Sequence, residues 1–232
     1  MTTVISLGGS IVAPDTVDIA FLKDFATLIK ELLDADKERR FIFVVGGGGP
    51  ARMWQQAYRA VRTALNAAVV DEAADWIGIM ATRLNAQLVK AVMGAYCTDD
   101  VVIDPGVSVS FSGRVLLAAG WKPGFSSDYD AVLLAEQFKA DAVINLSNIA
   151  QVYTDDPKKN PNAKPIERIS WKEFRAMVGE EWSPGKNVPF DPVASRRADN
   201  IKLKVICTAG KDIPNLKKLL TGERFLGTEI TG

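Results

Sequence analysis

The sequence predicts an α/β fold in which a mainly parallel sheet is covered by helices on both faces. Short apolar runs alternate with amphipathic helical patterns along the whole chain, which is typical of parallel sheets. One run, Phe41–Val45, is apolar at every position, as expected for a strand buried on both faces. Two runs end directly in glycine-rich turns, Gly8–Ser10 and Gly46–Gly49. Because the carboxyl ends of parallel strands meet at one edge of a sheet, we expect both turns at the same edge.

The N-terminal half is expected to alternate strands with helices. We expect strands at Thr3–Leu7, Phe41–Val45, Val101–Ile103 and Arg114–Ala118, and helices at Asp18–Leu33, Ala51–Ala60 and Asp71–Ala95. Apolar residues recur at helical spacing in the first helix, and Asp18 is a suitable N-cap. In the longest helix the large apolar residues predict a buried stripe of Trp76, Ile77, Met80, Leu84, Leu88 and Val92. Trp76 is therefore expected to pack in the core rather than to stack on a base.

The C-terminal half continues the alternation with longer polar loops. We expect strands at Ala142–Ser147, Lys204–Thr208 and Gly227–Ile230, and helices ending at Ala140 and spanning Lys172–Gly179, Asp191–Asn200 and Asp212–Leu220. Ser126, Ser127 and Asp128 precede the first of these helices and are all good N-cap residues. The turn-rich runs Tyr153–Lys164 and Trp182–Pro192 are expected to be loops.

Composition limits the class of protein. The 232 residues suffice for one large α/β domain or two small ones, and no internal repeat or low-complexity linker divides them. We therefore expect a single domain over residues 1–232, with a modest boundary near residue 120. Lys and Arg total 28 and balance 28 Asp and Glu, so no overall field would attract nucleic acid or an anionic membrane.

The chain contains no histidine, which excludes His-based triads, His general bases and His metal ligands. A metal ion would have to be held by oxygen, which favours Mg²⁺, and the sequence predicts no dedicated cluster of protein ligands for it. Cys97 and Cys207 show no CxxC spacing and are expected to be reduced thiols of a cytoplasmic protein. No signal peptide is recognised at the N-terminus, and the longest apolar runs are too short to span a bilayer.

The two glycine turns indicate phosphate binding, although they match neither GxGxxG nor GxxxxGK[ST]. A glycine after a strand can also be a simple turn. Two such turns, with helix starts near Ser126–Asp128 and at Asp191, favour an anion-binding crevice because helix N-termini and glycine N–H groups attract phosphates. Arg52 and Arg83 could bind phosphate or lie on the surface. Asp75 could accept hydrogen bonds from ribose hydroxyls or be a surface carboxylate.

Six segments carry a resemblance to a known family. They are ISLGGSIV at 5–12, VVGGGGPAR at 44–52, DWIGIMATRLNA at 75–86, PGFSSDYDAVLLA at 123–135, NLSNIAQVYTDDPKKNP at 145–161 and FDPVAS at 190–195. In this order and spacing the chain resembles the amino acid kinase superfamily, most closely its short, archaeal-type UMP (uridylate) kinases. The resemblance implies a three-layer α/β/α sandwich (the carbamate kinase-like fold) and transfer of a phosphoryl group from ATP to UMP with Mg²⁺. It also implies an acceptor-binding half of about residues 1–120 and an ATP-binding half of about residues 121–232.

The resemblance further implies three groups of site residues. The ATP-binding group is Gly9, Ser10, Gly48, Arg52, Ser147, Asn148, Tyr153 and Asp156. The UMP-binding group is Gly47, Asp75, Trp121, Lys122, Pro123, Gly124, Phe125, Ser126 and Ser127. The catalytic group, which would orient the reacting groups or the metal, is Asp128, Asp191 and Arg52. In the second turn Gly47 would thus face the acceptor and Gly48 the donor, and Gly48→Val should abolish transfer while leaving the fold largely intact.

Two positions depart from the family pattern. Ser6 stands where many superfamily members carry lysine, so another cation should neutralise phosphate charge; Lys122 and Lys158 are candidates, or else solvated loop lysines. Ala150 and Gln151 replace the Asp-Gly pair that usually follows the strand asparagine. Because glycine commonly takes a positive φ in such a turn and glutamine does so only at a cost, the ATP-side loop is expected to differ in shape.

Two other functions remain open from the sequence. The Ala150–Gln151 turn and the Trp121–Lys122 loop could belong to a non-catalytic nucleotide-binding protein, similar to the molybdenum storage proteins, although the absence of histidine disfavours a metal-oxide cavity. Alternatively, the chain could phosphorylate a carboxylate, a carbamate or another phosphorylated acceptor. The resemblance also implies a role in pyrimidine nucleotide biosynthesis and a homo-oligomer, a hexamer with the long N-terminal helices in the interface.

Overall fold

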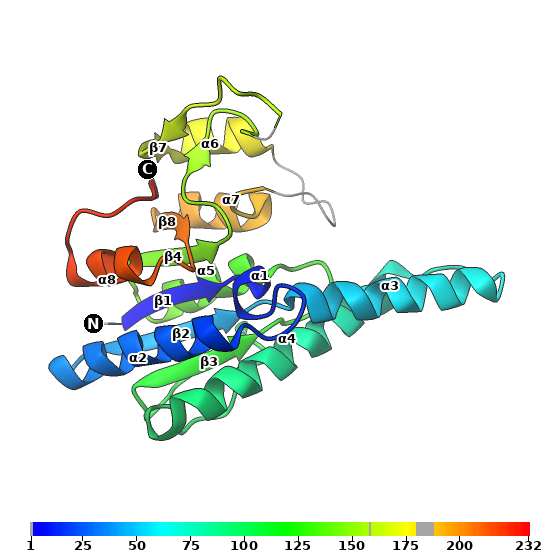
Figure 1. Ribbon diagram of the computed structural model, residues 1–232, viewed down its shortest axis with the longest axis horizontal. Helices are drawn as coiled ribbons and strands as arrows, with labels where there is room; N and C mark the ends of the chain where they lie inside the picture. Colours follow the sequence, from blue (N-terminus) through cyan, green and yellow to red (C-terminus); the bar gives the residue numbers. More distant parts are fainter. Residues whose placement is uncertain (1, 158, 180–187) are drawn as a thin grey trace.

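The core of the structure is a seven-stranded sheet with the strand order β3-β2-β1-β4-β8-β9-β7 (Figure 1). The computed structural model describes residues 2–157, 159–179 and 188–232. Five strands are parallel: β1 (Thr2–Leu7), β2 (Arg40–Val45), β3 (Val115–Ala119), β4 (Ala142–Ser147) and β8 (Lys204–Ala209). The strand β9 (Thr228–Thr231) is antiparallel to β8, and β7 (Arg168–Ser170) is parallel to β9. The predicted mainly parallel sheet is therefore confirmed.

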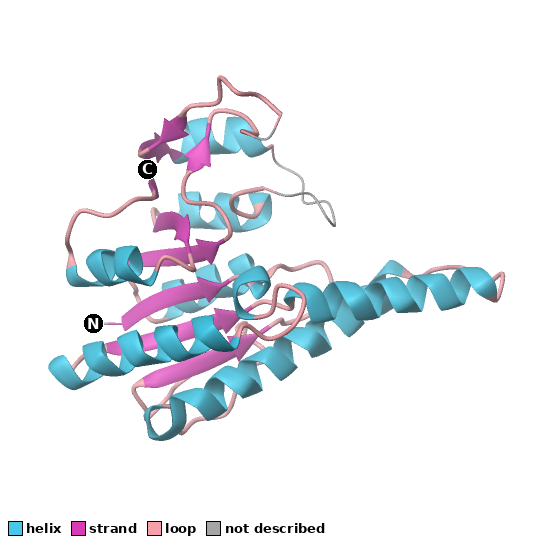
Figure 2. Cartoon of the chain, in the orientation of Figure 1, coloured by secondary structure: helices cyan, strands magenta, loops and turns pink. Residues whose placement is uncertain are grey.

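Helices cover both faces of this sheet and form the predicted three-layer sandwich (Figure 2). One face packs against α2 (Ile19–Ala35), α4 (Asp71–Met93) and α8 (Ile213–Thr221). The other face packs against α5 (Ser127–Gln137), α6 (Trp171–Val178) and α7 (Pro192–Asn200). Side chains that alternate along each strand enter the two cores in turn, so the central strands are mostly apolar, with buried polar exceptions such as Ser6 in β1 and Asn145 in β4.

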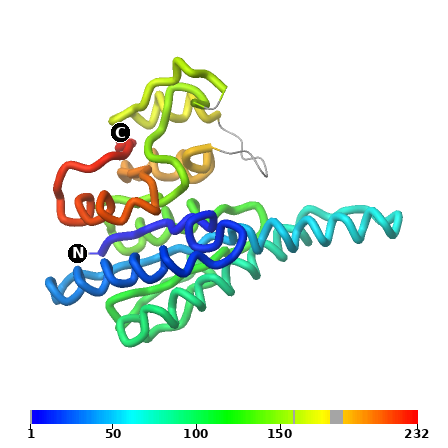
Figure 3. The backbone as a smooth tube through the Cα atoms, in the orientation of Figure 1, coloured from blue at the N-terminus to red at the C-terminus, as the bar shows by residue number. Residues whose placement is uncertain are grey.

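Two of the remaining helices begin at the carboxyl ends of strands. The short α1 (Gly9–Val12) follows β1, and α3 (Gly48–Ala64) follows β2. Figure 3 shows that α3 and the beginning of α4 extend together beyond the sheet. The strands β5 (Val152–Tyr153) and β6 (Pro165–Ile166) form a separate antiparallel pair, and a 3₁₀ turn covers Gly94–Tyr96.

Side-chain caps fix the starts of the helices as the sequence indicates. Asp18 accepts a hydrogen bond from Phe21 N at 2.9 Å, and Ser126 accepts one from Tyr129 N at 3.3 Å. Asp191 caps α7 in the same way, with Pro192 at the first helical position. Because these caps satisfy N–H groups that a helix start leaves free, they place α5 and α7 at defined positions behind the sheet edge.

The predicted buried stripe of α4 is wrong. Trp76, Met80 and Leu84 are exposed by 39%, 50% and 70%, and Ile77, Leu88 and Val92 are only partly buried. The buried face is instead rich in small residues, and it comprises Ala74, Gly78, Ile79, Ala81, Asn85, Ala86, Val89 and Met93. The small side chains let α4 lie close to β3 and α3, whereas Trp76, Met80 and Leu84 stay exposed and Leu88 and Val92 pack at the edge of the core. Trp76 is accordingly not a core residue.

Several boundaries also differ from the sequence-based expectation. The strand expected at Val101–Ile103 is reduced to one isolated bridge between Val102 and Ala118. The helix expected to end at Ala140 ends at Gln137, and α3 already begins inside the glycine turn. Most of the loop predicted at Trp182–Pro192 lies outside the described residues, as does Lys158. Within the described part, no helix is both long and apolar enough to span a membrane.

Candidate functional site

The candidate site lies at the carboxyl edge of the parallel strands. Along this edge, the residues that follow β3, β2, β1 and β4 are Gly120, Gly46–Gly48, Gly8–Ser10 and Asn148. The Gly8 N–H donates to Leu146 O at 3.0 Å, and the Gly46 N–H donates to Leu7 O at 2.9 Å. These hydrogen bonds hold the ends of neighbouring strands next to one another along this edge. The chain leaves β1 toward β2 and later returns on its other side as β4, and such a reversal of strand order is where open α/β sheets bind ligands.

The two glycine turns interlock through their backbones. A Cβ atom added to Gly9 would overlap the backbone N of Gly48, and one added to Gly48 would overlap the carbonyl oxygens of Ala13 and Gly9. Gly48 also has a φ of +62°, a conformation that side chains rarely adopt. The expectation that Gly48→Val leaves the fold largely intact is therefore wrong, because the substitution would force the two turns apart.

Unpaired donors gather where the turns meet. The N–H groups of Gly9, Ser10, Gly47 and Gly48 donate to no backbone carbonyl in the part of the chain that the structure describes. Gly47 and Gly48 also form the start of α3, whose dipole adds partial positive charge. This arrangement suits a phosphate or another oxyanion, which accepts hydrogen bonds from donors of this kind.

A buried amide, Asn85 on α4, supports the second turn from behind. Its Nδ2 donates to Gly46 O at 2.9 Å and to Gly47 O at 3.1 Å, and the residue is only 3% exposed. This residue was not predicted from the sequence. The available signal was a polar residue in register with the small side chains of Gly78, Ala81 and Val89, a pattern that marks a closely packed helix face.

The loop Trp121–Ser127 is held by side chains from α4 and α5. The Trp121 N–H donates to Asp130 Oδ2 at 3.2 Å, and Arg83 Nη2 donates to Trp121 O at 3.2 Å. The Gly124 N–H donates to Asp75 Oδ2 at 3.3 Å. Asp75 therefore lies beside the loop for which acceptor binding is predicted from the sequence. Arg83 is neither a free surface arginine nor placed at the glycine turns; it supports this loop.

The same loop carries a stack of aromatic rings. Trp121 and Phe125 have ring centroids 5.1 Å apart, and Phe125 and Tyr129 are 4.9 Å apart. Lys122 Nζ lies 3.8 Å from the centre of the Trp121 ring. A cation above a ring face is stabilised by the ring quadrupole, so the Lys122 charge is kept at this loop. Pro123 lies within the loop, and Ser126 and Ser127 complete it at the start of α5.

Two neighbouring carboxylates lie behind the first glycine turn. Asp128 Oδ1 accepts from Ser6 Oγ at 3.0 Å, and Asp128 Oδ2 accepts from the Asp191 N–H at 3.2 Å. Burial raises the pKa of Asp128 to about 6, and the nearby Asp191 charge adds to the rise. Burial also raises the pKa of Asp191, although the backbone N–H groups of Ala194 and Val193 act against it. Ser6 thus contacts Asp128 but brings no positive charge.

A third carboxyl group, Asp130, is fully buried behind the acceptor loop. Burial raises its pKa to about 7, against the hydrogen bond from Trp121. Its second oxygen, Oδ1, has no hydrogen-bond partner among the described residues. The sequence analysis did not single out Asp130, nor did it single out Thr82, whose hydroxyl accepts from the Gly120 N–H at 2.8 Å.

The residues expected at the ATP nucleoside are less closely grouped. Ser147 and Asn148 lie at the end of β4 beside Gly8, whereas Tyr153 belongs to the β5–β6 pair. Asp156 is exposed in the turn that follows and lies 3.9 Å from Lys159 Nζ. Arg52 is exposed and its Nη2 donates to Pro14 O at 2.7 Å, so it contacts the segment that follows α1.

The structure shows how Ala150 and Gln151 are accommodated in place of the family's Asp-Gly pair. Gln151 is buried, and its Nε2 donates to Gly227 O at 3.0 Å. Gln151 is also not among the described non-glycine residues with a positive φ, which are Asn66, Lys139 and Lys202. The turn therefore avoids the strain that the sequence suggested, because glutamine points inward and ties β5 to the segment before β9.

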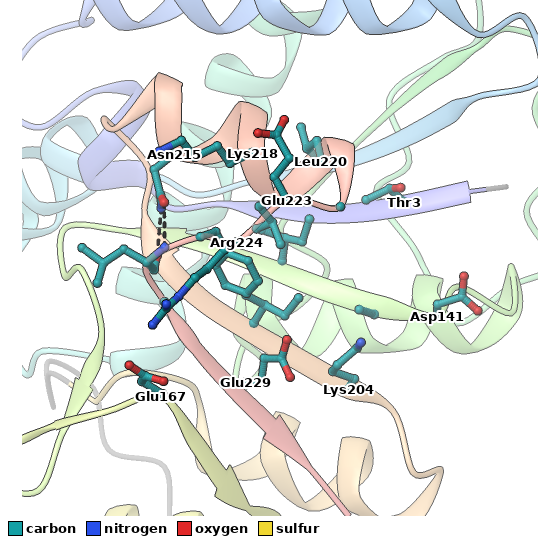
Figure 4. A pocket seen from close by; sticks show the side chains of 18 of the residues that line it. Thr3, Asp141, Glu167, Lys204, Asn215, Lys218, Leu220, Glu223, Arg224 and Glu229 are labelled. Atoms are coloured by element: carbon teal, nitrogen blue, oxygen red, sulfur yellow. Dashed lines mark hydrogen bonds between the residues drawn. The ribbon is translucent and has the colours of Figure 1, made fainter.

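A large cavity lies elsewhere. It encloses about 1120 Å³ at the opposite edge of the sheet, between the first residues of β1, β4 and β8 and the loop after α8 (Figure 4). Figure 4 shows Asn215 bonded to that loop, through Leu226. No residue of the predicted site lines this cavity.

Comparisons with known proteins agree with this geometry. A family model described as "Amino acid kinase family" matches residues 1–208. A curated uridylate kinase of Thermoplasma acidophilum is 35% identical over 229 residues, covering 98% of this chain and 95% of the relative. That of Methanospirillum hungatei JF-1 is 33% identical, with 99% and 94% covered. A solved uridylate kinase structure from Archaeoglobus fulgidus covers 100% of both chains with a TM-score of 0.83 at 32% identity.

Proposed function

The chain belongs to the amino acid kinase family, and from this premise we propose that it transfers the γ-phosphoryl group of ATP to UMP, giving UDP. Relatives of nearly equal length that carry the name uridylate kinase support this activity. They do not favour the non-catalytic alternative or a different acceptor. The proposed role in the cell is pyrimidine nucleotide biosynthesis in the cytoplasm.

One observation carries the proposal, namely the order of loops along the sheet edge. The loop Trp121–Ser127 with Asp75 lies beside β3, the interlocked glycine turns lie at β2 and β1, and Ser147 and Asn148 lie at β4. We assign UMP to the first position and ATP to the last. The two phosphate chains would then meet over the glycine N–H groups, with Gly47 on the acceptor side and Gly48 on the donor side.

The transfer needs no protein nucleophile. A UMP phosphate oxygen attacks the γ-phosphorus of ATP, the bond to the β–γ bridging oxygen breaks, and ADP leaves. The chain's contribution is to hold the two anions in line and to stabilise charge on the transferred group. Removing one preorganised donor of this kind typically slows a reaction about 10²–10³-fold. Asp128 and Asp191, with Arg52, are proposed to orient the reacting groups.

The residues present fit a magnesium ion that arrives with the nucleotide. Within the described residues no group of three or more potential ligands could hold a metal on its own. The buried Asp191 Oδ2, however, has no hydrogen-bond partner there, and carboxylate oxygen is the ligand that Mg²⁺ prefers. Asp191 and Asp128 are therefore the proposed protein contacts of a nucleotide-bound Mg²⁺. The ion would supply neutralisation of phosphate charge.

We also propose that the chain forms a homo-oligomer, a hexamer, through α3 and α4. Large apolar side chains are exposed on both helices: Met53, Trp54 and Val61 on α3 with Leu65 at its C-cap, and Trp76, Met80 and Leu84 on α4. Apolar surface of this kind usually marks an interface. Light scattering should give a mass above that of one chain, and Leu84→Glu should lower it. A monomer at micromolar concentration would contradict the proposal.

The activity is tested with purified protein, ATP and Mg²⁺ in an assay that couples nucleoside diphosphate formation to NADH oxidation. The acceptor panel should contain UMP, CMP, AMP, carbamate and an amino acid carboxylate. We expect turnover with UMP to exceed that with every other acceptor. Absence of turnover with UMP, or a preference for a carboxylate or carbamate, would contradict the proposal.

A further inference from the structure

We propose that Asn85 is a positioning residue for phosphoryl transfer, acting through the second glycine turn rather than by touching a substrate. The inference rests on the proposed function, because it assigns a role in the same reaction. Its basis is the pair of hydrogen bonds from Asn85 Nδ2 to the carbonyl oxygens of Gly46 and Gly47.

These two carbonyls belong to the peptide units that carry the N–H groups of Gly47 and Gly48. A trans peptide unit is planar, and its C=O and N–H point in opposite directions. Because Asn85 draws both carbonyls toward α4, the two N–H groups are directed away from α4. They are also two of the four donors with no backbone acceptor in the described part of the chain. Gly47 O also accepts a longer hydrogen bond, of 3.4 Å, from the Ala51 N–H of α3, whereas Asn85 holds both carbonyls and so directs both donors.

The chemistry at this position requires an amide. A glycine turn has few steric restraints, so its peptide units could rotate and turn carbonyl oxygens toward a phosphate. The asparagine NH₂ offers two donors, one for each carbonyl. A hydrogen bond to a carbonyl also polarises the peptide unit and strengthens its N–H as a donor. Aspartate, which has nearly the same shape, would place negative charge against both carbonyl oxygens.

Burial makes this contact independent of solvent. Asn85 is 3% exposed and lies on the small-residue face of α4, between Ala81 and Val89. On the same helix, Thr82 accepts from the Gly120 N–H, and the adjacent Arg83 donates to Trp121 O. One rigid helix thus holds both the glycine turn and the start of the acceptor loop, and Asn85 sets the part that faces the transferred group.

The chain offers a matched control in Asn215. This residue is 8% exposed, and its Nδ2 donates to Thr208 Oγ1 at 3.0 Å and to Leu226 O at 2.8 Å. Asn215→Ala and Asn85→Ala each remove a buried amide that makes two hydrogen bonds through its Nδ2. Asn215 also accepts from the Leu226 N–H at 2.7 Å and contacts none of the described residues of the glycine turns or of the predicted substrate-binding group, so the structural effect of removing it should be at least as large as that of Asn85→Ala.

Steady-state kinetics with UMP at saturating ATP and Mg²⁺ distinguish a positioning role of Asn85 from a purely structural effect of its removal. For Asn85→Ala we expect kcat to fall about 10- to 100-fold, with KM for UMP changed less than about threefold, because the donors matter most when charge develops in the transition state. For Asn215→Ala we expect kcat within about twofold of wild type. A kcat in Asn85→Ala equal to that of Asn215→Ala, or a change confined to KM, would overturn the proposal.

Asn85→Asp keeps the test decisive if the alanine variant does not fold. It preserves the side-chain volume and should reduce kcat at least as much as Asn85→Ala, since it cannot donate to either carbonyl when ionised. Full activity of folded Asn85→Asp would overturn the proposal. Circular dichroism and the thermal midpoint establish that each variant is folded before its kinetics are compared.

ATP binding, measured by calorimetry with Mg²⁺ and without acceptor, separates this inference from the proposed function. We expect the dissociation constant of ATP to rise about tenfold in Asn85→Ala and to stay constant in Asn215→Ala. If wild type does not phosphorylate UMP but this contrast holds, the proposed acceptor is wrong and Asn85 still positions the turn. Equal ATP affinity in wild type and Asn85→Ala overturns the role of Asn85 whatever the acceptor.

Discussion

Replacing Asp130 by asparagine should make the protein more stable, and the gain should increase with pH. The buried carboxyl has its pKa raised from 3.8 to about 7, mainly by burial. The folded protein therefore keeps this proton up to about pH 7, whereas the unfolded chain releases it near pH 3.8. Between these values the unfolded state binds fewer protons, so the stability of the wild type falls as pH rises. The free energy of unfolding of the Asp130→Asn variant does not fall in this way, because an amide does not titrate.

The size of this stability difference follows from the shift in the pKa of Asp130. Moving the pKa of one carboxyl from 3.8 to about 7 is worth about 4 kcal/mol over the whole window, of which about 3 kcal/mol falls between pH 5 and pH 8. The free energy of unfolding of Asp130→Asn, relative to wild type, should thus rise by that amount between these pH values. An amide oxygen can still accept from the Trp121 N–H, so KM for UMP should change little.

Urea unfolding followed by tryptophan fluorescence at pH 5, 6, 7 and 8 measures this difference. The exposed Asp141 provides the control, and Asp141→Asn should differ from wild type by less than about 0.5 kcal/mol at every pH. Parallel stability profiles for wild type and Asp130→Asn would refute the reasoning, because they would mean that Asp130 is ionised in the folded protein throughout.

Two further predictions concern the glycine turns and the carboxylate behind them. Gly9→Ala should destabilise the protein by about 3 kcal/mol or more, because its Cβ would overlap the Gly48 backbone N; an unchanged thermal midpoint would contradict the interlocked turns. With a pKa of about 6, Asp128 should become protonated as pH falls through that value, and kcat/KM should decline there in wild type. Asp128→Asn should lower kcat/KM about 10- to 100-fold and remove this acid limb from the pH–rate profile, and persistence of the limb would assign it to another group.

The fold was predictable because its main signals are local. The apolar runs of β1, β2 and β4 are buried on both faces, and Asp18, Ser126 and Asp191 cap helices where the sequence indicated. The two glycine turns were also found correctly, since a run of glycines after a buried strand leaves few alternatives. In each case the residues that define the element are neighbours in sequence.

The errors arose where distant parts of the chain decide the outcome. The large apolar residues of α4 suggested a buried stripe, but Leu84 is 70% exposed because the small residues on the opposite face pack closely against the body. Hydrophobicity alone does not distinguish a core face from an unpaired surface. Gln151 likewise looked strained from its neighbours, whereas its partner Gly227 is 76 residues away.

In the candidate site, too, local motifs were predictable and long-range contacts were not. The residues that would touch substrates lie in recognisable motifs, but those that hold the motifs in place do not stand out. Asn85 and Thr82 act across long sequence separations, through hydrogen bonds with Gly46 and Gly120. Such contacts leave only a weak trace in one sequence, a polar residue on an otherwise small or apolar helix face.

The most direct test of the central claim is a crystal structure with UMP, Mg²⁺ and a non-hydrolysable ATP analogue bound together. We predict UMP between Asp75 and the loop Trp121–Ser127, the nucleoside of the analogue beside Ser147 and Asn148, and the γ-phosphate over the Gly47 and Gly48 N–H groups. Nucleotides in the reverse order along the sheet edge, or either nucleotide in the cavity beside α8, would contradict the account.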